Sequence, residues 1–169
     1  MENLEQISPR TFAQVASPTL HLLDVENMLG GWVSPGRVAE MWHAYATSAP
    51  VLLGDHVIAG FGPRTAVAGM FELPHWVRKV VGPNSSDCAD IVLIDCVDVH
   101  HAAHRYARVI IGSCDGRFAA LAWTLRALGA RVWFVDTEAS SVSWLLQRTC
   151  QGHLTVPCPP PARAHAHAS

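Results

Sequence analysis

The feature that most constrains this chain is a regular alternation of short apolar runs with longer segments of helical spacing. Five apolar runs predict strands, at 20–25, 56–59, 76–81, 107–111 and 131–135. Helices are predicted at about 36–48, from 63 to before Pro74, at about 87–104, between 118 and 128, and at 141–149. This alternation predicts an α/β domain with a parallel sheet covered by helices on both faces.

Length and composition favour one globular domain. The chain has 169 residues, of which 50% are hydrophobic and 15% are charged, so it can bury a sizeable core. We expect a lead-in over 1–19, one domain over 20–150, and a disordered tail rich in Pro, Ala and His over 151–169. The formal net charge of -2 gives no general basic surplus, so binding of a polyanion needs a local basic patch or a metal ion.

The sequence also favours a cytoplasmic protein without a membrane segment. The acidic start, Met1 to Glu5, lacks the apolar core of a signal peptide, and no apolar run reaches the ~18 residues of a membrane span. The five cysteines include no Cys-x-x-Cys pair, which fits a reducing compartment better than a disulfide framework or a cysteine-ligated zinc site.

Three aspartates are expected at the same edge of the sheet. Asp24 and Asp115 follow the first and fourth predicted strands, and Asp90 lies in the first turn of the helix after the third. In open parallel sheets, ligands bind beyond the carboxyl ends of the strands, where the strand order reverses. Two charges ~4 Å apart repel by roughly 4 kcal/mol at an effective dielectric near 20. The trio therefore predicts a Mg²⁺ or Mn²⁺ site, at which an ion could activate water.

Each acid also has a purely structural interpretation. Asp24 could cap the turn after its strand, and Asp115 could cap the next helix. Asp90 could simply be a first-turn carboxylate that the helix dipole stabilises. On the helix from 87, the acids at 87, 90, 95 and 98 are predicted to share one arc opposite the apolar residues. Asp95 would lie ~7.5 Å along the axis from Asp90, so it would act only through a second ion or through a neighbouring ligand.

The other candidate residues give weaker signals of function. His100 and His104 have a helical metal-binding spacing but are not expected near the acidic edge. Cys114 lies beside Asp115, with no histidine placed to activate it as a nucleophile. Trp32, in a loop, is the tryptophan best suited to stack on a base. A modest phosphate-binding patch, or only a solvated strand edge, is expected from Arg64, Arg78 and Lys79.

Three strings, in this order, resemble the NYN domain family, a branch of the PIN-like nucleases, and most of all an actinobacterial-type subgroup. They are LLDVENMLGG at 22–31, GPNSSDCADIVLID at 82–95 and IGSCDGRF at 111–118. The resemblance spans roughly residues 20–148. It implies a three-layer α/β/α sandwich whose central five-stranded parallel sheet has the order 3-2-1-4-5.

The resemblance also implies an activity and a set of site residues. The family's metal-binding acids correspond to Asp24, Asp90 and Asp115, and its polar helpers to Asn27 and Ser113. Bound Mg²⁺ or Mn²⁺ would supply an activated water that hydrolyses phosphodiester bonds of RNA, most simply single-stranded RNA.

The chain departs from the family pattern in three places. Cys114 replaces a glycine, Arg117 stands where many relatives carry an acid, and Asp87 stands where a lysine is frequent. Two hypotheses follow: a metal-dependent endoribonuclease in which Arg117 contacts the RNA backbone, or a catalytically inactive NYN-fold module that binds RNA or a protein. A haloacid-dehalogenase-type phosphatase is a third idea, but its second aspartate is replaced by Glu26. Exposed sheet edges and six tryptophans are compatible with a homodimer.

Overall fold

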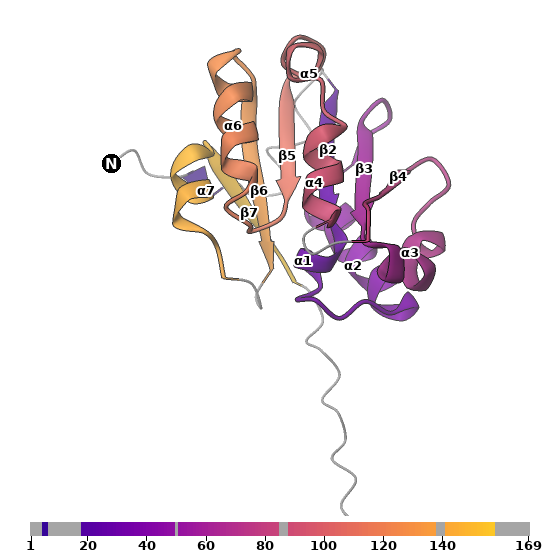
Figure 1. Cartoon of the computed structure of the whole chain (residues 1–169). Coiled ribbons are helices and arrows are strands. Elements are labelled where there is room, and N and C mark those ends of the chain that lie inside the picture. The colour runs from indigo at the N-terminus through magenta and orange to yellow at the C-terminus, as the bar shows by residue number, and fades with distance from the viewer. Residues whose placement is uncertain (1–4, 7–17, 50, 85–87, 138–140, 158–169) are drawn as a thin grey trace, which may run out of the picture.

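A computed structural model describes residues 5–6, 18–49, 51–84, 88–137 and 141–157 of the chain. These residues form an α/β fold around one parallel sheet with the order β1-β7-β6-β5-β2-β3-β4 (Figure 1). The strands are β1 (Glu5–Gln6), β2 (Thr19–Asp24), β3 (His56–Phe61), β4 (Arg78–Val81), β5 (Arg108–Gly112), β6 (Arg131–Thr137) and β7 (Gly152–Val156).

The helices fill the connections between strands. They are α1 (Val25–Met28), α2 (Pro35–Ser48), α3 (Pro63–Gly69) with a following 3₁₀ turn (Met70–Glu72), α4 (Cys88–Asp95), α5 (Val99–Arg105), α6 (Phe118–Ala127) and α7 (Trp144–Thr149). The short α1 was not anticipated, because its four residues, Val-Glu-Asn-Met, are too few to show a helical periodicity.

The five strands expected from the sequence pair in the expected order, but the expected count of five is wrong. β7 pairs in parallel with β6, and the two-residue β1 pairs with β7. The expected domain end at 150 is therefore too early, since β7 lies within the segment assigned to the tail. β7 buries Leu154 and Val156 and leaves Thr155 exposed, a pattern too short to distinguish from a tail. Residues 158–169, and 1–4 and 7–17 of the lead-in, lie outside the described residues.

The predicted helix at about 87–104 is two helices. The first helix, α4, ends at Asp95, and Asp98 caps α5 by accepting a hydrogen bond from the His101 amide at 2.9 Å. The predicted arc of four acids is consequently wrong for the described positions. Asp90 is buried on the same helix as Leu93, whereas Asp95 and Asp98 are exposed. The fourth acid, Asp87, lies outside the described residues.

Helices cover both faces of the sheet. The first core packs α1, α2 and α3 against side chains such as Leu23, Ile110 and Val135. The second packs α4, α5, α6 and α7 against side chains such as Leu22 and Phe134 (Figure 1). Neighbouring residues of each central strand thus enter opposite cores, which explains their continuous apolar runs. Within the described part of the chain, every helix is too short or too polar to span a bilayer.

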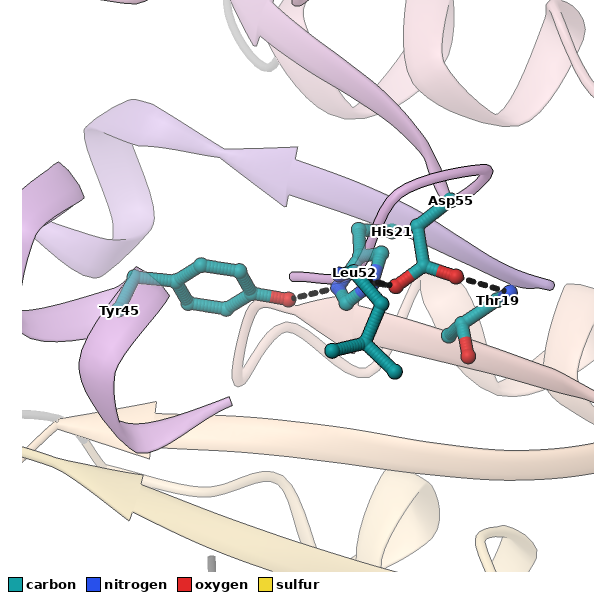
Figure 2. Close-up of polar contacts among 5 residues, drawn as sticks. All are labelled: Thr19, His21, Tyr45, Leu52 and Asp55. Atoms are coloured by element: carbon teal, nitrogen blue, oxygen red, sulfur yellow. Dashed lines mark hydrogen bonds and ion pairs between the residues drawn. The ribbon is translucent and has the colours of Figure 1, made fainter. Parts of the chain in front are cut away.

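A buried polar network closes the amino edge of the sheet, where the parallel strands begin (Figure 2). Asp55, just before β3, accepts hydrogen bonds from the backbone amides of Thr19 at 2.7 Å and Leu52 at 2.8 Å. His21 lies between Asp55 and Tyr45, with its Nε2 3.5 Å from the carboxylate and its Nδ1 2.7 Å from the tyrosine hydroxyl. The network ties β2, α2 and the loop before β3 together.

Candidate active site

Asp24 lies at the carboxyl edge of the sheet, where the parallel strands end. It is the last residue of β2, between β3 and β5, so it marks the point where the strand order reverses. Its Oδ1 accepts a hydrogen bond from the Asn27 amide at 3.1 Å, and its Oδ2 accepts one from the Ser113 hydroxyl at 3.2 Å. Asp24 therefore does cap the short helix α1, but capping occupies only one of its oxygens.

Glycines allow α4 to bring Asp90 to the same edge. A Cβ at Gly60 would lie 2.6 Å from the Leu93 side chain, and one at Gly82 would lie 2.1 Å from the Cys88 carbonyl oxygen. Both contacts are shorter than any real Cβ contact, so only glycine lets α4 pack this closely on β3 and the end of β4. The first turn of α4 then places Asp90 beside Asp24.

Asp24 and Asp90 form a buried acid pair. Their residues are 2% and 6% exposed, respectively. Burial raises the pKa of Asp24 well above its ordinary value, and the hydrogen bond and charge of Asp90 raise it further. The donors Asn27 and Ser113 oppose this rise only in part. Such a pair needs either a shared proton or a cation, because two adjacent carboxylates cannot both remain ionised at low cost.

The loop after β5 supplies the third predicted acid. Asn27 holds this loop, because its side-chain oxygen accepts a hydrogen bond from the Cys114 amide at 2.9 Å. The Ser113 hydroxyl accepts one from the Asp115 amide at 3.2 Å, so Ser113 links Asp115 to Asp24. Asp115 itself is partly exposed and accepts a hydrogen bond from the Arg117 amide at 2.9 Å, which gives it a turn-forming role as well.

Arg117 contacts an acid of the site. Its guanidinium lies 3.7 Å from Oδ2 of Asp90, and its side chain is 46% exposed. Arg117 is predicted from the sequence to contact RNA, and an exposed guanidinium beside the acid pair is compatible with that role. The ion pair also reduces the negative charge that a bound cation would otherwise neutralise.

Asp24, Asp90 and Asp115 line one open cavity of about 360 Å³ at the carboxyl edge. Asn27 lines it too, as does Glu26, which was not predicted from the sequence as a site residue. Glu26 accepts hydrogen bonds from the Gly62 amide at 2.7 Å and from the Thr65 hydroxyl, so it fixes the start of α3. Its position two residues after Asp24 was the only sequence signal for this placement.

The aspartates do not form a compact cluster of three. Among the residues that the structure describes, no group of three or more His, Cys, Asp or Glu side chains is arranged to hold a metal ion. Asp24 and Asp90 adjoin, whereas Asp115 faces the same cavity from the loop. The residues that could hold a metal are thus a carboxylate pair with a third acid nearby.

Several other candidates lie away from this cavity. Asp95 is exposed at the far end of α4 and does not line it. His100 and His104 are exposed on α5. Cys114 is the exception, because it lines the cavity, but it is 4% exposed. Trp32 is half-exposed in the loop after α1, with the Arg37 guanidinium 5.5 Å from its ring.

Comparisons with known proteins leave the site to be interpreted from its own chemistry. No protein-family model matches this chain, and no curated protein shows significant similarity to it.

Proposed function

We propose that this protein is a metal-dependent endoribonuclease of the NYN branch of PIN-like folds, which hydrolyses phosphodiester bonds of single-stranded RNA. The observation that carries the proposal is the buried pair of Asp24 and Asp90 at the reversal point of a parallel sheet. A buried acid with a raised pKa in a cavity is a typical feature of functional sites. The resemblance of the three sequence strings to NYN domains supports the same activity.

The donor set fits a hard divalent cation. Mg²⁺ is commonly held by only one or two protein carboxylates and keeps several waters, so a pair of aspartates is sufficient. Asp24 and Asp90 would hold Mg²⁺ or Mn²⁺, with Asp115 facing the same cavity. When bound, such an ion lowers the pKa of a coordinated water and screens the charge of a phosphate.

The remaining residues would keep this acid pair in place and receive the substrate. The Ser113 hydroxyl donates to Asp24 and fixes the orientation of its carboxylate. The Asn27 side chain positions the loop that carries Asp115. Arg117 holds an exposed guanidinium beside Asp90, where it can bind a phosphate of the RNA backbone.

Cleavage of a fluorescent single-stranded RNA with Mg²⁺, Mn²⁺ or EDTA tests the proposal. We expect Mn²⁺-dependent cleavage that falls at least about 100-fold in Asp24→Asn. Even residues that only hydrogen-bond to a metal ligand change metal affinity or activity by about 10–100-fold when they are mutated. Glu40→Gln, the same loss of one acid at an exposed position of α2, is the matched control and should cleave normally. Equal cleavage by Asp24→Asn, or none by the wild type with either metal, would contradict the proposal.

The second candidate is a catalytically inactive NYN-fold module that binds RNA or a protein. The Arg117–Asp90 ion pair favours it, because an arginine already neutralises one acid of the pair. This candidate predicts binding that ignores EDTA and Asp24→Asn, without any cleavage. Arg117→Glu then becomes informative, since it returns an acid to the position where many relatives carry one. Gain of cleavage in this variant would identify Arg117 as the cause of inactivity.

A cytoplasmic location and a homodimer stay predictions from the sequence. The participation of Asp95 through a second ion does too, and its exposed position makes Asp95→Asn a simple test in the same cleavage assay.

A further inference from the structure

A second cavity, of about 430 Å³, lies where β3 and β4 meet the chain around α5. Leu20, Val57 and Ile58, from the first halves of β2 and β3, are among its lining residues. The side chains of Leu20 and Ile58 belong to the core under α4–α7, and that of Val57 belongs to the opposite core. None of its lining residues lines the cavity of the acid pair. Its size falls within the range of small-molecule sites, roughly 300–1,000 Å³.

Flat rings form much of the wall of this cavity. Trp76 contributes an indole that is 50% exposed and packs edge-on against Trp42, with ring centroids 5.6 Å apart. His56 and Tyr106 lie at a centroid distance of 5.4 Å, and the His56 Nδ1 is hydrogen-bonded to the tyrosine hydroxyl. His101 adds a further ring. The half-exposed Trp76 and the exposed His56 and His101 offer surfaces on which a planar ring can stack, whereas Tyr106 is buried and holds His56 in place.

The cation of this cavity is available, whereas its acids are engaged. Arg78, the first residue of β4, is exposed, and its side chain makes no hydrogen bond or ion pair with any residue that the structure describes. In contrast to Arg78, the two carboxylates of the lining already accept hydrogen bonds. Asp55 accepts from two backbone amides, and Asp98 accepts from the His101 amide. The five donors of the Arg78 guanidinium are therefore open to a ligand that carries an anionic acceptor.

We infer that this second cavity binds a nucleotide, with its base among the aromatic side chains and its phosphate on Arg78. A nucleobase is planar and carries carbonyl or ring-nitrogen acceptors, and a phosphate is the anion that a guanidinium binds best. The same chemistry is present in a free nucleotide and in an unpaired nucleotide of an RNA strand. The inference does not depend on the proposed hydrolysis, because the cavity shares no residue with the acid pair.

Titration calorimetry of the full chain in EDTA tests this inference, with AMP, adenosine and a hexamer of adenylate as probes. We expect saturable binding of AMP that weakens at least about tenfold in Arg78→Gln, because a charge-assisted contact is lost. The affinity for adenosine, which has no phosphate, should change less than about twofold in the same variant. Arg148→Gln removes the same charge from an exposed position of α7 and should leave AMP binding unchanged.

A second variant tests the stacking surface. Trp76→Leu should weaken AMP and adenosine equally, by about tenfold, as loss of one base–aromatic stack does. Circular dichroism establishes that each variant is folded. A hexamer that binds tighter than AMP through Arg78 identifies RNA as the source of the nucleotide, and equal affinities identify the free nucleotide. Absence of saturable binding to every probe overturns the inference, as does an equal loss of AMP binding in Arg148→Gln.

Discussion

Two aspartates at opposite edges of the same sheet show opposite electrostatic behaviour. At the amino edge, burial raises the pKa of Asp55, but hydrogen bonds from His21, Leu52 and Thr19 outweigh it and lower the pKa below its ordinary value. At the carboxyl edge, burial and the neighbouring Asp90 raise the pKa of Asp24 well above that value. Both side chains expose little surface, but Asp55 is only partly buried as a residue, so the depth of burial contributes to the difference together with the neighbouring groups.

The difference lies in what each carboxylate faces. Asp55 faces donors, and the neutral His21 and Tyr45 beyond it complete a network whose members satisfy one another (Figure 2). Asp24 faces another acid across an open cavity. A buried acid with enough donors stabilises the fold, whereas a buried acid against an acid leaves charge for a ligand to neutralise. The comparison therefore supports a structural role for Asp55 and the proposed ligand-binding role for Asp24.

Removing Asp55 should have the largest effect on stability. In Asp55→Ala, the amides of Thr19 and Leu52 lose their acceptor and His21 loses a partner. We expect the free energy of unfolding to fall by about 2–4 kcal/mol, the usual result of leaving several donors unsatisfied. Urea denaturation followed by circular dichroism measures it. A loss no greater than that of Glu40→Ala, at an exposed position of α2, would remove the distinction between the two edges.

Divalent cations should stabilise the carboxyl edge specifically. At a Mn²⁺ concentration ten times its Kd, binding to the folded state alone adds about 1.4 kcal/mol to the free energy of unfolding. Thermal denaturation with and without Mn²⁺ should show this gain for the wild type and for Asp55→Ala, but not for Asp24→Asn. A Mn²⁺ effect of equal size in Asp24→Asn would place the ion elsewhere.

Asp24→Asn should raise stability in EDTA at neutral pH. The amide keeps an oxygen for the Asn27 backbone and removes a charge that Asp90 opposes. We expect a gain of about 1 kcal/mol in urea denaturation, since functional sites often retain groups that destabilise the fold. Asp115→Asn, a partly exposed acid of the same cavity, serves as control and should change stability little. A clear loss of stability in Asp24→Asn would show that its capping role outweighs the repulsion.

The sequence was sufficient for the carboxyl edge because the sheet itself brings strand ends together. Alternating apolar runs predicted the five strands, and the family resemblance implied their order, which placed Asp24 beside the loop of Asp115. The pairing of Asp90 with Arg117 could not be predicted, because it depends on how closely α4 packs at Gly60 and Gly82. The break between α4 and α5 was also missed, since apolar residues continue through 96–97.

The amino edge was not predicted as a site of any kind. Asp55 lies in a loop, His21 reads as one polar residue within an apolar strand, and Tyr45 fits the buried face of α2. Each has an ordinary local explanation, and only the tertiary structure shows that the three are partners. A cluster made by contacts between distant segments leaves no periodic signal in the sequence. Strand β7 was missed for a related reason, because its pairing with β6 rather than its five residues defines it.

The pH dependence of stability should distinguish the edges by sign, with the smallest effect of the series. The pKa of Asp24 is raised in the folded state. Its contribution to stability is therefore fully present below the unfolded pKa of about 4 and is lost as the pH rises through the folded pKa. Because the folded pKa of Asp55 is lowered, its contribution is present above about 4 and is lost as the pH falls through the folded pKa. Titration of Asp24 belongs to the pair with Asp90, so the whole pair shapes its curve.

Urea denaturation in EDTA between pH 3 and 8 measures both slopes. The stability gained by Asp24→Asn over the wild type should grow as the pH rises, and the stability lost by Asp55→Ala should shrink as the pH falls below about 4. His21, whose pKa burial lowers, should reduce wild-type stability as the pH falls below about 6.5, so each variant is compared with the wild type at the same pH. If both variants gave differences of the same sign and slope, the two aspartates would have equivalent environments. The assignment of one edge to structure and the other to function would then lose its electrostatic basis.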